Sequence, residues 1–226
     1  MPYMLVLLLM LVPCLAQAGA WPRDKGAVFL SLSQDVARRP GGGLSSTQSL
    51  YLEYGVTETL TFGVKANRNA DGLTFDVLSF TRMSLGNPDA ANKFAVELAL
   101  GGRWNILTGY EAVVQPALHW GRGFTAPAAI SFLGNGWMGV EASLGHGFFT
   151  QQTWAKADFT LGFTPADETH LILQLRSHHD RFGSSYSVAP SFVRRFSRAL
   201  KLEIGGLWHL SGNEPPRLRA ATWIEF

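Results

Sequence analysis

The segment RSHHDRFGSSYS contains the residue types that acyl-transfer enzymes use. It holds His178, His179, Asp180, Ser184 and Ser185, which could supply a nucleophile, a general base and an orienting carboxylate. Neighbouring residues of a strand point to opposite faces, so His178 and His179 cannot both serve one site. The segment is therefore kept as a hydrolase alternative, beside its simpler interpretation as a solvated loop.

Metal, cofactor and nucleic-acid chemistry find less support. His178, His179 and Asp180 could ligate a metal, but nothing in the sequence fixes a third ligand near them, and we expect none. RRPGGGLSS lacks the Gly-Lys-Ser/Thr and the following helix of a phosphate-binding loop, so no cofactor is expected. The net charge is only +2 and the basic residues are interleaved with acids, which argues against nucleic acid.

Most of the other ionisable residues alternate with apolar ones. In residues 93–104, Lys93, Glu97 and Arg103 share one face of an extended chain, whereas Phe94 and Trp104 share the other with Val96, Leu98 and Leu100. This period of two indicates β-strands, and the helical period is scarce. Gly, Pro, Asn and Asp separate the alternating segments.

About twelve strands are predicted in this way, with ten or fourteen as alternatives. They cover residues 26–35, 49–56, 59–68, 73–83, 92–104, 110–120, 136–147, 153–163, 169–179, 185–195, 199–210 and 217–226. Val77 and Leu78 break the alternation of the fourth strand, and a bulge is one explanation. Residues 123–135 could form a long turn or part of a strand.

The connections predict an up-and-down barrel. Those near residues 57–58, 164–168 and 196–198 are short, whereas the intervening ones are generally longer, as in membrane-spanning barrels. The segments 86–92 and after Trp120 depart from this rule.

Aromatic residues recur ten positions apart on one face, as in the pairs Phe94 with Trp104 and Tyr110 with Trp120. Ten residues span roughly 33 Å along a strand, or about 25 Å of height at a tilt of about 40°, which matches the apolar band of a membrane barrel. Aromatic rings favour the two rims of that band. The expected girdle consists of Phe94, Trp104, Tyr110, Trp120, Phe163 and Trp208.

The chain ends on RLRAATWIEF, an alternating run with a terminal aromatic residue. ATWIEF resembles the C-terminal strand of Gram-negative outer-membrane β-barrels, and YLEYGVTETLTFGVKA loosely resembles small proteobacterial barrels, some of them described as transporters. The resemblance implies that the barrel-assembly machinery recognises this strand and that it closes the barrel against the first strand. The residues that carry the signal are Leu218, Ala220, Thr222, Ile224 and Phe226.

Residues 1–18 are typical of a signal peptide, with an apolar run from Leu5 to Leu11 and an Ala16-Gln17-Ala18 cleavage pattern. Cleavage after Ala18 or Ala20 is expected; an uncleaved anchor is the alternative. Cys14 is the only cysteine, so the processed chain can form no disulfide. AWPRDKG, which follows, is expected to be a periplasmic lead-in with solvated charges.

If the apolar face contacts lipid, the polar face lines the barrel interior. Mixed charges there could cross-link the strands or line a conduit for small solutes; a barrel of about twelve strands suits a narrow pore. No ring of one charge sign is visible, so strong ion selectivity is not expected. The candidates are Glu53, Lys65, Glu97, Arg103, Glu111, Glu141, Lys156, Asp158, Arg176, His178, Lys201, Glu203 and Arg219, together with Gln115, His119, Gln174, His209 and Glu225.

The sequence thus predicts an all-β protein, in which residues 21–226 form one transmembrane antiparallel up-and-down β-barrel of the bacterial outer membrane. Its expected partners are outer-membrane lipids, the assembly machinery and small solutes. The favoured function is a narrow channel, with a closed structural or surface-interaction barrel as the alternative. A lipid hydrolase ranks last, because the His and Ser spacing matches neither the phospholipase-type nor the lipid A deacylase-type motif.

Overall fold

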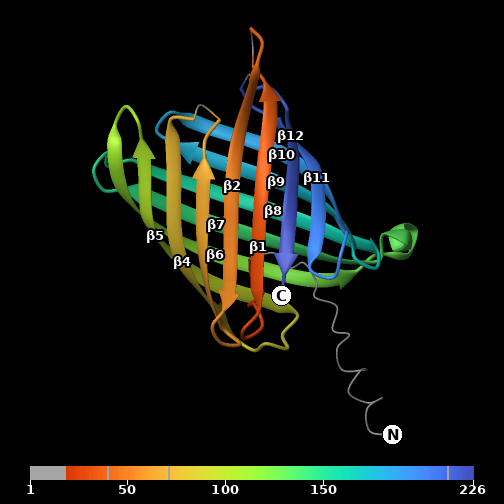
Figure 1. The fold of residues 1–226 in the computed structure, drawn as a ribbon. Helices are drawn as coiled ribbons and strands as arrows, with labels where there is room; N and C mark the ends of the chain where they lie inside the picture. The colour runs from red at the N-terminus through yellow and green to blue at the C-terminus, as the bar shows by residue number, and fades with distance from the viewer. Residues whose placement is uncertain (1–18, 40, 71, 213) are drawn as a thin grey trace, which may run out of the picture.

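The chain folds into a closed barrel of twelve antiparallel strands in the computed structural model, which describes residues 19–39, 41–70, 72–212 and 214–226 (Figure 1). Each strand pairs with its neighbours in sequence, and the last pairs with the first. The predicted fold class and the favoured strand number are confirmed. The strands are β1 (Val28–Arg38), β2 (Leu44–Gly55), β3 (Leu60–Arg68), β4 (Thr74–Leu85), β5 (Asn92–Asn105), β6 (Gly109–Thr125), β7 (Asn135–Gly147), β8 (Thr153–Ala166), β9 (Thr169–Asp180), β10 (Gly183–Arg195), β11 (Leu200–His209) and β12 (Arg217–Glu225).

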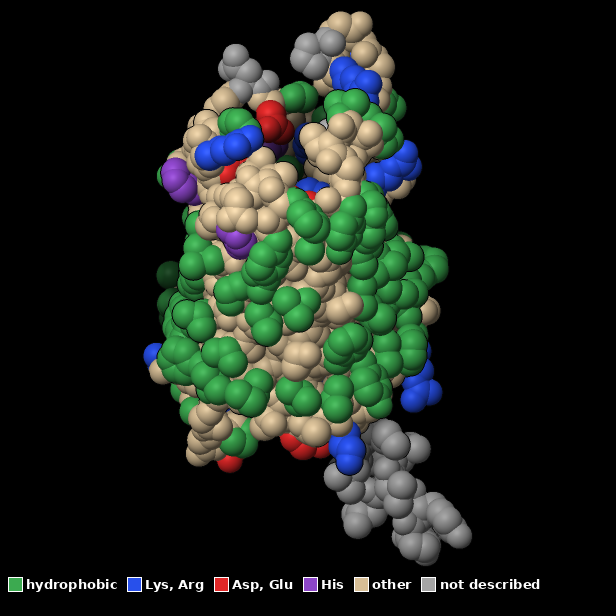
Figure 2. Space-filling model, turned by 90° about the vertical axis from the view of Figure 1, so that its left-hand side faces the viewer, with side chains coloured by type: hydrophobic (Ala, Val, Ile, Leu, Met, Phe, Trp, Pro, Cys, Tyr) green, Lys and Arg blue, Asp and Glu red, His purple; other side chains and the backbone are tan. Residues whose placement is uncertain are grey.

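The outer surface of the barrel is apolar because one side chain in two points outward. On β5, Phe94, Leu98 and Leu100 are exposed, whereas Glu97 and Ala99 between them are buried. Figure 2 shows hydrophobic side chains over the middle of one face, with charged ones gathered toward both ends. Within the described residues, no helix has the length and apolar character needed to cross a membrane.

Strands β1 and β12 close the barrel. Their register runs from Phe29 opposite Glu225 to Ala37 opposite Arg217. The seam continues past the strands, because the backbone N–H of Val28 donates to the carbonyl of Phe226 (2.7 Å) and that of Phe226 donates back to Val28 (3.2 Å). Both ends of the barrel domain therefore lie at one end of the cylinder, which we call the terminal end; the opposite end is the loop end.

The connections at the two ends do not differ as the sequence suggested. At the loop end, β1 runs to Arg38 and β2 begins at Leu44, so these strands absorb most of the long Gly-rich segment. The longest connection, residues 126–134, lies at the terminal end and holds the 3-10 helix η2 (Ala128–Leu133). The expectation of longer loops on one side was wrong, because polar residues near Leu44 continue the strand ladder.

The bulge expected at Val77 and Leu78 is also absent. The register of β4 runs unbroken against both β3 and β5. The alternation is disturbed because Leu78 and Phe80 point inward, and Phe80 is 1% exposed. An irregularity occurs instead between Phe163 and Ala166, where β8 pairs with β9.

Candidate functional site

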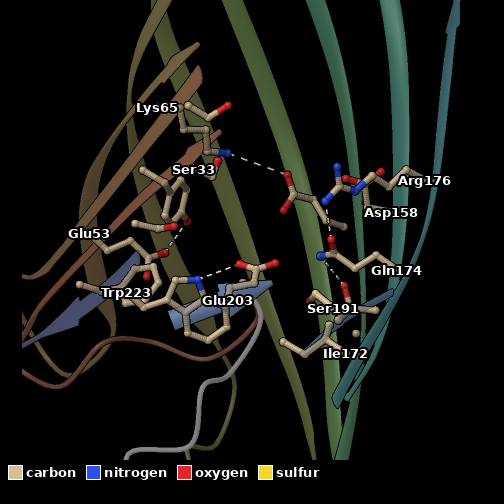
Figure 3. Close-up of a pocket in the computed structure, with 18 of the residues that line it drawn as sticks. Ser33, Glu53, Lys65, Asp158, Ile172, Gln174, Arg176, Ser191, Glu203 and Trp223 are labelled. Carbon is tan, nitrogen blue, oxygen red and sulfur yellow. Dashed lines mark hydrogen bonds and ion pairs between the residues drawn. The ribbon is translucent and has the colours of Figure 1, made fainter. Parts of the chain in front are cut away.

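The barrel encloses a cavity of about 590 Å³. One wall comes from β1–β3 and carries Ser33, Ser49 and Asn67, while β8 and β9 supply Lys156 and Arg176 opposite. Figure 3 shows Lys65 and Glu53 on one side of this space and Asp158, Gln174 and Arg176 on the other. The interior is therefore neither fully packed nor apolar.

Arg82 on β4 is the centre of a buried ionic network. Its guanidinium lies 2.6 Å from Glu53 and 2.8 Å from Glu97, and it also donates to the hydroxyl of Tyr51 at 2.8 Å. The side chain is only 2% exposed. Burial of so many charges is tolerated because each is paired and hydrogen-bonded.

Lys65 extends the network across the interior. Its Nζ lies 2.7 Å from Glu97 and 3.9 Å from Glu141 on β7. The ring of His119 sits between the two carboxylates, with Nε2 3.4 Å from Glu97 and Nδ1 3.5 Å from Glu141. Strands β3, β5, β6 and β7 are thus linked through their inner faces.

A second cluster links the strands at the seam. Arg219 lies 3.5 Å from Asp35 and 3.3 Å from Glu203. The indole N–H of Trp223 donates to Glu203 (3.0 Å), and Lys201 pairs with Glu225 at 2.7 Å. These contacts join β1, β11 and β12 where the barrel closes.

Lys156, Asp158 and Arg176 differ from the other inner charges. They line the cavity, and within the described residues none of them makes an ion pair. Arg176 instead donates to Gln174, which in turn donates to Thr160. Lys156, Asp158 and Arg176 are therefore the charged residues that a solute inside the barrel could contact.

The remaining interior candidates lie toward the loop end. Arg103 pairs with Asp76 at 2.7 Å and packs over the ring of Trp154. Glu111 accepts a hydrogen bond from the backbone N–H of Thr150 (3.0 Å) and another from its hydroxyl.

The possible hydrolase residues do not form one triad. Nε2 of His178 is 3.3 Å from Asp180. Nδ1 of His179 is 2.7 Å from the hydroxyl of Ser184. The carboxylate and the serine therefore contact different histidines on opposite faces of β9, and Ser185 pairs in register with His178.

The girdle residues lie on the outer face at the two ends. Trp104 and Tyr110 face each other across β5 and β6 at the loop end, with ring centroids 5.0 Å apart, and Trp208 lies near the loop end of β11. Phe94 is opposite Trp120 at the terminal end. Phe163 packs edge-on against Phe124 there.

The N-terminal residues contradict the expected solvated lead-in in part: Asp24 and Lys25 are exposed, whereas Ala20 and Arg23 are not. Ala20 is 2% exposed, and Nε of Arg23 lies 2.5 Å from Glu53. Arg23 also packs over the ring of Phe29. This segment lies inside the terminal end, where Arg23 binds the second carboxylate oxygen of Glu53, the residue that also pairs with Arg82; the predicted signal peptide itself falls outside the described residues.

Sequence reasoning missed several residues of the interior. Tyr51, Asp35 and Arg23 were not singled out, and neither were Asp76 and Arg82. The last two share one face of β4 with Phe80, so an inward assignment of that face would have found them. Arg23 gives no such signal, because its partner Glu53 is distant in sequence.

A closed antiparallel barrel with an apolar exterior and an ionic interior defines the class of transmembrane β-barrels. No protein-family model matches the sequence, and no curated protein matches it. Solved structures do resemble it, at identities that concern the fold alone. An outer-membrane channel from Pseudomonas putida F1 has a TM-score of 0.61 at 11% identity, covering 93% of this chain and 99% of that one.

Two porins are similar to the same extent. NanC porin has a TM-score of 0.59 at 10% identity, covering 86% of this chain and 98% of its own. KdgM porin has a TM-score of 0.57 at 7% identity, covering 88% and 99%. The chain thus has the fold of bacterial outer-membrane channels and porins.

Proposed function

We propose that this protein is a narrow channel of the bacterial outer membrane that conducts small polar solutes. The observation that carries the proposal is the interior cavity of about 590 Å³, lined by Lys156, Asp158 and Arg176, which make no ion pair with any other residue that the structure describes. A cavity of this size falls within the range that holds small ligands. Charges of both signs on the cavity wall can replace part of a solute's hydration shell.

The fold supports the location. A closed barrel leaves no unpaired strand edge for lipid to meet, and structures of the same fold include an outer-membrane channel and two porins. One KdgM structure is described as a complex with disordered oligogalacturonate. In the proposed arrangement outer-membrane lipids surround the apolar band, the terminal end faces the periplasm, residues 1–18 direct export, and the assembly machinery recognises Leu218 to Phe226.

The charge balance indicates weak selectivity. Interior ion pairs combine both signs on neighbouring strands, as in Arg219 between Asp35 and Glu203. Among the described residues that line the cavity, charges of both signs are mixed and form no ring of a single sign, so the proposed channel favours small solutes by size more than by charge.

Planar-bilayer recording tests the proposal. We expect discrete unitary currents from the refolded protein, smaller than those of a wide porin. Ser49→Trp places a large side chain in the cavity and should reduce the unitary conductance severalfold. Ser46→Trp on the same strand is the matched control, since it points outward and should leave the current unchanged. A pure, folded protein that passes no current would overturn the proposal.

A closed structural barrel is the second candidate. The network around Arg82 and the N-terminal residues inside the terminal end favour it, because both fill part of the cross-section. Liposome swelling distinguishes the two: uptake of a small sugar supports a channel, whereas intact liposomes containing folded protein support the closed barrel.

A further inference from the structure

The terminal end of the barrel holds the backbone of Gly19 directly against the ring of His119. A Cβ atom added at Gly19 would lie 2.5 Å from Nδ1 of that ring. Ala20, the next residue, is 2% exposed. The chain therefore enters the interior at Gly19, the residue that would come first if the signal peptide were cleaved after Ala18.

His119 is an unusual neighbour for a neutral backbone. It is 3% exposed, and within the described residues neither ring nitrogen makes a hydrogen bond. The carboxylates of Glu97 and Glu141 lie 3.4 and 3.5 Å from the two nitrogens. The buried carboxylate of Glu97 and the partly exposed carboxylate of Glu141 thus lie on either side of the ring, and the single N–H of a neutral imidazole can donate to only one of them.

Glu141 is the less satisfied of the two carboxylates. Glu97 contacts Lys65 at 2.7 Å and Arg82 at 2.8 Å, whereas the cation nearest to Glu141 is Lys65 at 3.9 Å. An ammonium group supplies three donors and a positive charge, which is what this position needs.

The barrel wall is shaped to admit the segment that follows. A side chain at Gly121 on β6 would collide with the indole ring of Trp21, and one at Gly55 on β2 would collide with the carbonyl of Asp24. Gly123 shares the face of Gly121, yet the atom nearest to its added Cβ is 3.9 Å away. The close approach is therefore specific to the position that Trp21 covers.

Arg23 anchors the segment. Besides its ion pair with Glu53, its backbone N–H donates to the hydroxyl of Thr61 at 3.2 Å, and Thr61 is 1% exposed. Its guanidinium lies 4.4 Å from the centre of the Phe29 ring. Three strands, β1, β2 and β3, thus hold one arginine.

We propose that cleavage after Ala18 creates an α-ammonium group on Gly19 that binds inside the barrel beside His119 and Glu141, so that residues 19–23 form a plug at the terminal end. Cleavage after Ala20 would remove the two residues that fill the space around His119. The binding of the amine is independent of conduction, and only the effect of the plug on current rests on the proposed function.

Two measurements test the amine site in the full processed chain. Intact mass should show Gly19 as the first residue. A water-soluble amine-reactive ester at neutral pH should label the α-amine at least about tenfold more slowly in the folded barrel than in urea. A chain that begins elsewhere, or equal labelling rates in the two states, would overturn the proposal.

Matched variants separate the plug from general damage. Gly121→Val should displace Trp21 and raise α-amine labelling severalfold, whereas Gly123→Val should behave as wild type. Arg23→Gln should also raise α-amine labelling severalfold, and it leaves the residues of the barrel wall unchanged. Its control is Lys25→Gln, which replaces an exposed residue and should label as wild type does. If Gly121→Val labels at the same rate as Gly123→Val, and Arg23→Gln at the same rate as Lys25→Gln, no plug exists.

Recording from the same variants gives the consequence for conduction. Gly121→Val and Arg23→Gln should raise the unitary conductance above that of wild type. If neither wild type nor any variant passes current, but the expected differences in α-amine labelling are observed, the channel proposal fails and the amine site stands. If wild type conducts and displacing the segment changes only labelling, the amine binds but does not plug the barrel.

Discussion

Arg82 shows how single residues stabilise an interior of this kind. It joins Glu53 on β2 to Glu97 on β5 and leaves no buried charge between them unpaired. The guanidinium of Arg82 and Nζ of Lys65 both lie over the ring of Phe80, at 5.1 and 4.8 Å from its centre. The network combines ion pairs with aromatic packing, so its parts depend on one another.

Arg82→Met should lower the free energy of unfolding by about 3 kcal/mol, the low end for breaking a buried pair, because Glu53 retains Arg23 and Glu97 retains Lys65. Guanidinium unfolding in lipid vesicles, followed by tryptophan fluorescence, measures the change. Arg198→Met in an exposed turn is the control. An equal effect of the two substitutions would contradict the central role of Arg82.

The strands were predictable because one face of each meets apolar surroundings and the other meets polar ones. Period-two alternation found all twelve, and several of their ends shifted by a few residues, as where β2 begins at Leu44 and β6 continues to Thr125. The inner face of β4 was not predictable in the same way, since Phe80 packs against Tyr51 from another strand. The course of residues 19–25 depends on contacts with Glu53 and His119. Alternation within a strand carries no information about contacts between residues so distant in sequence.

Strand β12 allows its backbone and side-chain roles to be tested separately. Deleting Phe226 removes two seam hydrogen bonds and the terminal aromatic ring. Phe226→Ala removes the ring alone. If the ring is the assembly signal, both variants should reduce the level of folded barrel in the outer membrane severalfold.

Immunoblotting of outer-membrane fractions, with and without heating, measures that level. Leu44→Ala, a substitution of an exposed apolar residue at the loop end of β2, serves as the control. Normal levels of Phe226→Ala, with loss only on deletion, would assign the effect to the backbone seam.

The barrel as a whole has the opposite arrangement to a soluble globular protein: its ion pairs lie inside and its apolar side chains lie on the outer surface. Exposed residues such as Leu98, Leu118 and Ile204 are 49%, 64% and 69% accessible. Such a surface is stable only against an apolar solvent.

The chain lacking residues 1–18 should therefore refold only with detergent or lipid, and unheated samples should migrate differently from boiled ones on gels. Circular dichroism should report strand-rich structure in micelles. A monomer that stays folded and soluble without any amphiphile would contradict a membrane location.

The seam between β1 and β12 imposes an order in time. It joins Phe29 to Glu225, residues from opposite ends of the barrel sequence, so β1 and β12 each gain their second neighbour only when the barrel closes. Until then both outer edges of the growing sheet have unpaired backbone groups, which lipid cannot satisfy. The segment from Gly19 to Arg23 contacts residues of β1, β2, β3 and β6, so its full set of contacts forms only once the sheet has curved.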